Sequence, residues 1–268
     1  MKKIIALILA LMLAVCCFAA CSKPAEEKAE APAAVENDLI SSEAPTPIGE
    51  KLVMATNAAF PPYEYKEGDA FKGIDVEIAE AIAKKLGMEL VISDMEFDSI
   101  ITSVISGDSD FGMAGMTVTD ERKEQVDFSI SYATGVQSII VADNSTIATP
   151  DDLAGKKIGV QLGTTGDIYA CDDFGAENVT QYGKGADAVI ALKGGDVDAV
   201  IIDNEPAKAF VAANPGLKIL DTNYAIEDYA IAIKKGNTDL LNKIDGALEE
   251  LMVDGTIDAI IAKYINAN

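Results

Sequence analysis

The sequence predicts an α/β protein built of two similar lobes that face each other across a cleft. Short apolar stretches typical of strands alternate with longer stretches whose apolar residues recur every three or four positions, as in amphipathic helices. This alternation begins again after Tyr132, and a short segment of the first half recurs in the second. Two such units would face each other with the carboxyl ends of their strands, where ligands bind in open sheets.

The first half is predicted to run strand, helix, strand, helix, strand. One face of its first helix carries Ile74, Ile78 and Ile82, and Gly87 is typical of the residue that ends a helix. The predicted strands cover residues 51–56, 90–93 and 111–114, and the predicted helices cover 73–86 and 98–106.

The second half repeats this pattern. At an offset of 88 residues Gly107 aligns with Gly195, and Gly115 stands opposite Asp203, each just past a comparable strand. Chance similarity is the alternative explanation. The predicted strands cover 157–161 and 199–202, and helices are expected from Thr165, at 186–192, and at 238–252 and 256–265, the last two packing on the first lobe.

The N-terminus indicates export. Lys2 and Lys3 precede an apolar run up to residue 20, as in a secretory signal, and its end before Cys21 resembles the site where bacterial lipoproteins are cleaved and acylated. An uncleaved membrane anchor is the alternative, although the run is short for a span. We therefore expect a lipoprotein signal peptide at 1–20, lipid such as palmitate on Cys21, and a flexible linker at 21–49, which is rich in Ala, Glu and Pro.

Composition excludes several functions. The chain has no histidine, which removes Ser-His-Asp and Cys-His catalysis and the usual zinc and iron ligand sets. We expect no metal and no cofactor. The net charge of −23 argues against nucleic acid as a partner. Beyond Cys21 only Cys171 remains, so no disulfide framework is available.

Arg122 is the only arginine of the chain. It falls in the first turn of a predicted helix capped by Thr119 or Asp120, where a cation opposes the helix dipole and a bound anion would relieve the conflict. The planar guanidinium offers two parallel donors that match a carboxylate. We therefore predict that Arg122 binds the α-carboxylate of a ligand. A solvated arginine, or one paired with Asp127, is the alternative.

Asp203 is predicted to face Arg122 across the cleft. It follows the apolar strand at 199–202, where its carboxylate would pair with an α-ammonium group. Alternatively, Asp203 only caps a helix that has Pro206 in its first turn. If both assignments hold, the ligand is a zwitterion gripped at its two charged ends, and it drives closure of the lobes.

Other candidates lie beside these two residues. The segment Gly163-Thr164-Thr165-Gly166, between a strand and a helix, resembles an anion-binding loop of backbone N–H groups. Phe60 and Phe97 each follow a first-lobe strand, and we expect their rings to form walls for a ligand side chain, with plain core residues as the alternative.

Five segments together resemble the family 3 extracellular solute-binding proteins of polar amino-acid ABC transporters, over about residues 51–265. The segments are 55–65, 73–76, 114–122, 126–129 and 228–233. The resemblance implies a two-lobed periplasmic-binding fold of type II with two crossing strands near 132–136 and 225–229. Lobe 1 would comprise residues 50–132 and 229–268. Residues 133–228 would comprise lobe 2 together with the hinges.

The resemblance also implies a function and a set of site residues. A lipid-anchored, extracytoplasmic monomer would bind a free L-amino acid and deliver it to an ABC permease in the membrane. Arg122, Thr117, Thr164 and Thr165 resemble the residues that bind the ligand carboxylate. Ala114 and Gly115 would supply backbone contacts, Asp203 the partner of the α-amino group, and Phe60 and Phe97 the walls.

Side-chain preference is expected to depend on Asn57, Gln161 and Ile202, where family members differ. Members that bind basic amino acids often carry Asp in place of Asn57, and the glutamine-selective pattern has Lys and His in place of Gln161 and Ile202. Both amides donate and accept hydrogen bonds, which favours an uncharged polar side chain. Basic ligands stay open, because Glu64 or Glu96 could reach the pocket.

Two other functions use the same fold. A dehydratase of the cyclohexadienyl type would need an acid or base placed at the leaving group of its substrate. A ligand-binding sensor would use the same cleft to signal. No residue of the sequence demands either function, so we expect a binding protein and no enzyme.

Overall fold

The computed structural model describes residues 50–265. The predicted signal peptide, Cys21 and the linker at 21–49 lie outside the described residues. Within the described part, no helix is long and apolar enough to cross a membrane. The same residues contain no group of three or more His, Cys, Asp or Glu side chains placed to hold a metal ion.

The first lobe is built on a five-stranded sheet in the order β5-β1-β6-β14-β7. Strand β1 runs parallel to β5 and β6, and its residues Leu52 and Met54 are fully buried. Strand β14 runs antiparallel to β6 and β7, so a segment from late in the chain completes this sheet. The strands are β1 (Lys51–Thr56), β5 (Glu89–Asp94), β6 (Phe111–Gly112), β7 (Val126–Phe128) and β14 (Ala232–Lys234).

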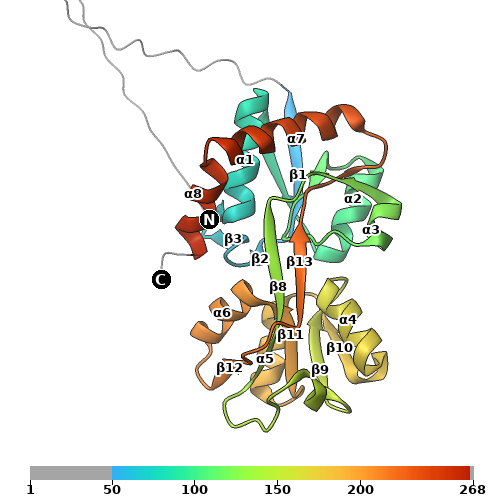
Figure 1. Ribbon diagram of the computed structural model, residues 1–268, viewed down its shortest axis with the longest axis vertical. Helices are drawn as coiled ribbons and strands as arrows, with labels where there is room; N and C mark the ends of the chain where they lie inside the picture. Colours follow the sequence, from blue (N-terminus) through green and yellow to red (C-terminus); the bar gives the residue numbers. More distant parts are fainter. Residues whose placement is uncertain (1–49, 266–268) are drawn as a thin grey trace, which may run out of the picture. The chain divides into compact units, whose positions relative to one another are not determined.

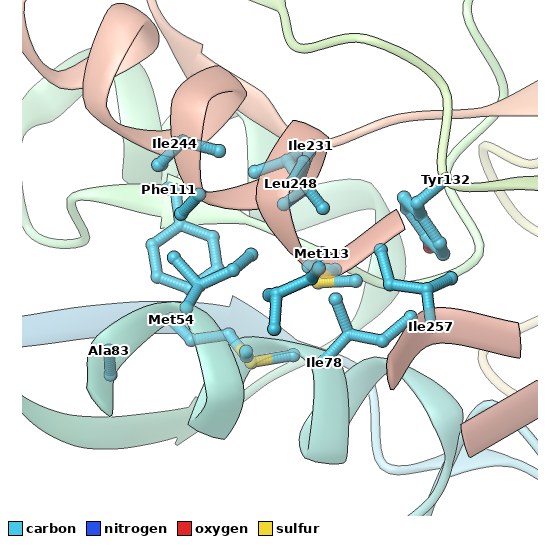
Figure 2. Close-up of a cluster of buried hydrophobic side chains, with 14 of the residues drawn as sticks. Met54, Ile78, Ala83, Phe111, Met113, Tyr132, Ile231, Ile244, Leu248 and Ile257 are labelled. Atoms are coloured by element: carbon cyan, nitrogen blue, oxygen red, sulfur yellow. The ribbon is translucent and has the colours of Figure 1, made fainter. Parts of the chain in front are cut away.

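Helices cover this sheet and close its core. In Figure 2, Ile244 and Leu248 of α7 and Ile257 of α8 lie in the same cluster as Met54 and Ile78. The apolar face of an amphipathic helix must pack against another element to be stable. This explains why α7 and α8 return to the first lobe. The helices are α1 (Ile74–Leu86), α2 (Ile100–Ser106), α3 (Asp120–Gln125), α7 (Thr238–Val253) and α8 (Thr256–Ile265), with a 3-10 turn η1 (Phe97–Ser99).

The second lobe is built on a sheet in the order β10-β9-β11-β8-β12, with β13 paired to β8. Strand β9 is parallel to β10 and β11, whereas β8 is antiparallel to β11, β12 and β13. The buried residues Ile139, Val141 and Ile158 form part of its core. The strands are β8 (Ala133–Ala142), β9 (Ile158–Gln161), β10 (Val179–Tyr182), β11 (Ala199–Asp203), β12 (Leu217–Ile219) and β13 (Ala225–Tyr229).

The repeated segment has the same structure in both lobes. Gly107 and Gly195 end α2 and α5 in the left-handed conformation, with φ of 86° and 81°, which favours glycine. The strands that follow, β6 and β11, lie parallel to β1 and β9 respectively. The second-lobe helices are α4 (Thr165–Phe174), α5 (Gly185–Gly194) and α6 (Asn204–Ala213), with 3-10 turns η2 (Pro150–Leu153) and η3 (Ala176–Asn178).

Strands β8 and β13 run side by side as an antiparallel pair (Figure 1). Strand β13 coincides with the crossing predicted at 225–229, and β8 extends beyond its predicted crossing into the second sheet because Ile139, Ile140 and Val141 continue its buried run. A Cβ atom on Gly135 would lie 2.3 Å from the Tyr229 hydroxyl, so this glycine makes room for the tyrosine between the strands.

A small sheet of β2 (Ala59–Phe60), β3 (Glu64–Glu67) and β4 (Ala70–Lys72) was not predicted. Its strands are too short to show the alternation that identifies a strand in a sequence. The sheet pairs Phe60 with Glu64. It meets α1 at Gly73, where φ is 126° and a Cβ atom would lie 2.1 Å from the Tyr63 carbonyl oxygen.

Candidate functional site

A cavity is lined by residues of both lobes and of both crossing strands. The structure brings together here all of the predicted site residues except Asp203 and Ile202. The lining residues are Asn57, Phe60, Glu64, Phe97, Ala114, Gly115, Thr117, Arg122, Gln137, Gln161, Thr164, Thr165 and Tyr229.

Arg122 is only 6 % exposed and points into this cavity from the first turn of α3. The cap of α3 is Thr119, whose hydroxyl accepts from the Arg122 N–H at 3.2 Å. The guanidinium donates to the Thr117 carbonyl oxygen at 2.7 Å and to the Gly163 carbonyl oxygen at 3.0 Å. Its carbon atom lies 5.4 Å from the centre of the Phe97 ring, a cation–π distance.

No ion pair formed within residues 50–265 includes Arg122. Asp127, the alternative partner, instead lies 4.0 Å from Lys235 and accepts from the Gly236 N–H. Burial lowers the pKa of Arg122, and Glu227 is the strongest charge that opposes this shift. Because a guanidinium has five N–H donors and two carbonyls engage part of them, donors are left for an anion in the cavity.

The loop before α4 lies beside Arg122 and adds further polar groups to the cavity. Thr164 caps α4 by accepting from the Asp167 N–H at 3.3 Å, and the hydroxyl oxygens of Thr165 and Thr117 lie 3.5 Å apart across the lobes. The N-terminus of α4 adds the positive end of a helix dipole. A guanidinium, threonine hydroxyls and a helix N-terminus together suit a carboxylate.

Two aromatic rings form apolar walls of the cavity. The Phe60 ring stacks on Tyr63 with 5.9 Å between ring centres, and Phe97 lies against Arg122. Gly115 has a φ of 52°, and a Cβ atom there would lie 3.1 Å from the Phe60 ring. The glycine therefore allows close approach of this ring.

Asn57 and Gln161 join the lobes at another part of the wall. The Gln161 amide donates to the Asn57 Oδ1 atom at 2.9 Å and to the Gly183 carbonyl oxygen at 3.2 Å, and the Asn57 amide donates to the Met95 carbonyl oxygen at 2.7 Å. Ile202, predicted to act with them, is buried in the core of the second lobe and is not a lining residue.

Asp203 lies behind the cavity wall, 1 % exposed. Its carboxylate accepts from the N–H groups of Val136 and Glu205 at 3.1 Å each and from the Tyr229 hydroxyl at 2.5 Å. It also caps α6, as in the alternative interpretation of the sequence. Burial raises the pKa of Asp203 to about 6, although these donors oppose the shift. Tyr229 packs beside Gly115, so it lies between the two positions that the repeat placed opposite each other.

Three lining residues were absent from the predicted set: Glu64, Gln137 and Tyr229. Glu64 carried one signal, its acidity just after the Phe60-Pro61-Pro62-Tyr63 segment. Glu96, the other acid considered for basic ligands, is exposed and does not line the cavity. Gln137 and Tyr229 lie on the crossing strands, and no local pattern shows which of their side chains turn towards the cavity.

Gln137 is held by a second buried acid. Its amide nitrogen donates to a Glu227 carboxylate oxygen at 3.0 Å, which leaves the Gln137 Oε1 atom and the other Glu227 oxygen without a hydrogen-bond partner. Glu227 is 5 % exposed and acts on Arg122 through space. The cavity wall near Arg122 therefore contains acceptor oxygens without a donor, on Gln137 and Glu227, as well as guanidinium donors without an acceptor.

Comparison with known proteins identifies relatives of the whole described region. The model of the bacterial extracellular solute-binding proteins, family 3, matches residues 52–267. The arginine-binding extracellular protein ArtP of Bacillus subtilis is 38% identical over 80% of this chain and 86% of its own length. The L-cystine-binding protein TcyJ of Escherichia coli is 31% identical over 81% of this chain and 83% of its own.

A solved structure shows the same fold. An ancestral arginine-binding protein bound to arginine superposes with a TM-score of 0.76 and 43% identity, covering 81% of this chain and 99% of that chain. The likeness confirms the two-lobed α/β fold class that the sequence predicts.

Proposed function

Because the chain belongs to the bacterial extracellular solute-binding proteins of family 3, we propose that it is the extracytoplasmic component of an ABC importer that binds a free basic L-amino acid. One observation carries this proposal: a buried arginine that pairs with no carboxylate of residues 50–265 lines a cavity enclosed by both lobes. A buried charge without a partner is costly, and a ligand carboxylate would supply that partner.

The polar groups of the cavity support one ligand orientation. The α-carboxylate lies on Arg122, with the hydroxyls of Thr117, Thr164 and Thr165 around it. The α-ammonium group lies near Tyr229 and the backbone of Ala114 and Gly115, with Asp203 behind the tyrosine as its counter-charge. Binding to both lobes at once favours the closed arrangement.

Glu64 supports a cationic side chain in place of the uncharged one that Asn57 and Gln161 favoured in the sequence. Once Arg122 is matched to the α-carboxylate and Asp203 to the α-ammonium, Glu64 remains as an acid in the lining without a counter-charge. The rings of Phe60 and Phe97 would flank the methylene groups, and the two amides would hydrogen-bond the side-chain end. Relatives named as arginine-binding and histidine-binding agree with this charge.

A thermal-shift screen against the twenty amino acids and citrulline tests the proposal, since a ligand that binds only the folded state raises the melting temperature. We expect the largest shift with arginine and a much smaller one with citrulline, which replaces the guanidinium by a neutral urea of similar shape. Failure of every amino acid to stabilise the protein would overturn the function. Equal shifts with citrulline and arginine would overturn the assignment of the side chain alone.

Membrane attachment through lipid on Cys21 is part of the same proposal, as are a monomeric state and delivery to a permease. Labelling of growing cells with radioactive palmitate should mark the protein, and Cys21→Ser should abolish the label. Absence of label from the unmodified protein would favour the uncleaved anchor instead.

We propose binding without catalysis. Incubation with arogenate or prephenate, followed by chromatography of the products, should show no turnover. Product formation that depends on Glu64, the free acid in the lining, would favour the dehydratase alternative.

A further inference from the structure

Two carboxyl groups meet in the wall of the cavity with too few hydrogen-bond donors for two anions. Glu64, on β3, and Asp75, in the first turn of α1, are both fully buried. Both oxygens of Glu64 and the Oδ1 atom of Asp75 have no hydrogen-bond donor among the described residues. The chain brings the two residues together, because the Asp75 N–H donates to the carbonyl oxygen of Tyr63, the residue before Glu64, at 2.9 Å, and the charge of Asp75 acts on Glu64. Such proximity is favourable only if one of the two carboxyl groups carries a proton.

The groups around this pair add no positive charge. Asp203 faces Glu64 from β11, Tyr63 precedes it on the chain, and the hydroxyls of Tyr132 and Tyr229 come from the crossing region. None of the ion pairs formed in the described chain includes Glu64 or Asp75. Arg122 lines the same cavity, but the charges that act on Glu64 are those of Asp75 and Asp203, so a second ionised carboxylate would meet repulsion from both.

Hydrogen bonding shows which member is the anion. The Asp75 Oδ2 atom accepts from the Gly115 N–H at 2.7 Å and from the Tyr132 hydroxyl at 2.9 Å. Two donors stabilise a carboxylate, whereas Glu64 receives none. Of the two carboxyl groups, Asp75 is therefore the better placed to be the anion and Glu64 the better placed to carry a proton.

The pKa shifts of the two groups agree with this arrangement. Burial raises the pKa of Glu64 well above its usual range, and the neighbouring charge of Asp75 raises it further. Burial also raises the pKa of Asp75 to about 6, against the lowering effect of its Gly115 and Tyr132 donors.

We propose that Glu64 and Asp75 share one proton in the ligand-free cavity and that the cationic side chain of the ligand replaces it, so that binding releases a proton. This inference rests on the proposed function, because it needs a cationic ligand beside Glu64. One positive charge leaves for solvent as H⁺ and one enters with the ligand, so the net charge of the wall is unchanged. Because a neutral side chain cannot take the place of the proton, Glu64 would favour ligands whose side chain is a cation.

Calorimetry in buffers of different ionisation enthalpy counts the protons. Arginine is titrated into the protein at pH 7.5, where Asp75 and Asp203 are ionised, in phosphate and in Tris. We expect release of close to one proton per arginine and none with citrulline. Binding of arginine without proton release would overturn the inference and leave the proposed function intact, whereas absence of arginine binding would remove both. Equal release with citrulline would overturn the role of the side chain.

The affinity should depend on pH with a defined sign. Release of one proton means that the dissociation constant for arginine rises about tenfold for each pH unit below the pKa of the pair, and is flat above it. A flat profile from pH 5.5 to 8 would contradict the exchange.

Two variants separate this mechanism from a structural role of the acid. Glu64→Gln keeps the shape of the protonated group, so we expect folding, weaker arginine binding and loss of proton release, with little change for citrulline. The control variant is Glu77→Gln. Glu77 lies on the same helix as Asp75 and is bonded to Lys263 and Tyr264, so this variant should release as many protons per arginine as the unmodified protein. Proton release that survives in Glu64→Gln would overturn the assignment of the released proton to this pair. If the variant does not fold, the proton count measured on the unmodified protein with arginine and with citrulline decides the question.

Discussion

The guanidinium of Arg122 donates to the carbonyl oxygen of Gly163 at 3.0 Å and so joins the first lobe to the loop before α4 in the second. The same side chain lines the cavity. The Arg122 guanidinium, which is proposed to hold the ligand carboxylate, therefore also contributes to closure. Its bond to Thr117 fixes its orientation within the first lobe, and its bond to Gly163 spans the gap between the lobes.

Arg122→Ala should weaken binding of every amino acid that the protein takes, by about 2–5 kcal/mol, because a buried carboxylate would lose its charged donors. Arg122→Lys should lose less, since an ammonium keeps the charge but not the two parallel donors. Calorimetry measures both, and Lys123→Ala, an exposed neighbour on α3, is the control. Full affinity in Arg122→Ala would show that the ligand has the opposite orientation.

Arginine should close the lobes and reduce the radius of gyration measured by X-ray scattering. The hydrogen bonds from Arg122 to Gly163 and from Gln161 to Asn57 cross between the lobes and can form only when they approach. A radius that stays constant from zero to saturating arginine would contradict closure driven by the ligand.

Asn57→Asp should increase the preference for arginine over citrulline by about tenfold or more, since a carboxylate at this wall adds a partner for a guanidinium. Gln161→Ala should change the ranking of ligands more than their general affinity. Competition calorimetry gives the ranking. The control variant Asn144→Asp makes the same charge change at an exposed position outside the cavity, and it should leave the ranking of ligands unaltered.

Two glycines should respond in opposite ways to alanine. In Gly135→Ala the new methyl group would lie 2.3 Å from the Tyr229 ring, so the free energy of unfolding should fall by roughly 1–3 kcal/mol. Gly246, inside α7, has open space around it, and Gly246→Ala should raise stability by about 0.5–1 kcal/mol. Urea unfolding measures both; destabilisation by Gly246→Ala would contradict the helical account.

Part of the site was predictable because its signals are local. A single arginine in the first turn of a helix is visible in the sequence, and so is the Gly163-Thr164-Thr165 loop between a strand and a helix. The offset of 88 residues also identified Gly107 and Gly195, since both end a helix in a conformation that favours glycine.

Other parts depended on packing and were therefore missed. Asp203 was predicted to face the cavity, yet three donors surround its carboxylate behind Tyr229, and only the antiparallel pairing of β13 with β8 brings that tyrosine there. Ile202, one residue earlier, turns into the second-lobe core because neighbouring residues of a strand point to opposite faces.

By itself, the sequence determined the α/β class, the order of the main strands and helices, the repeat and the position of Arg122 in the first turn of a helix, because periodicity, helix ends and composition act over a few residues. The tertiary structure alone decided that Glu64 is buried near Asp75 with no hydrogen-bond donor of its own, and that Gln161 reaches Asn57 across 104 residues of chain. The charge state and contacts of a buried group depend on which distant segments remove it from water, and no local pattern contains that information.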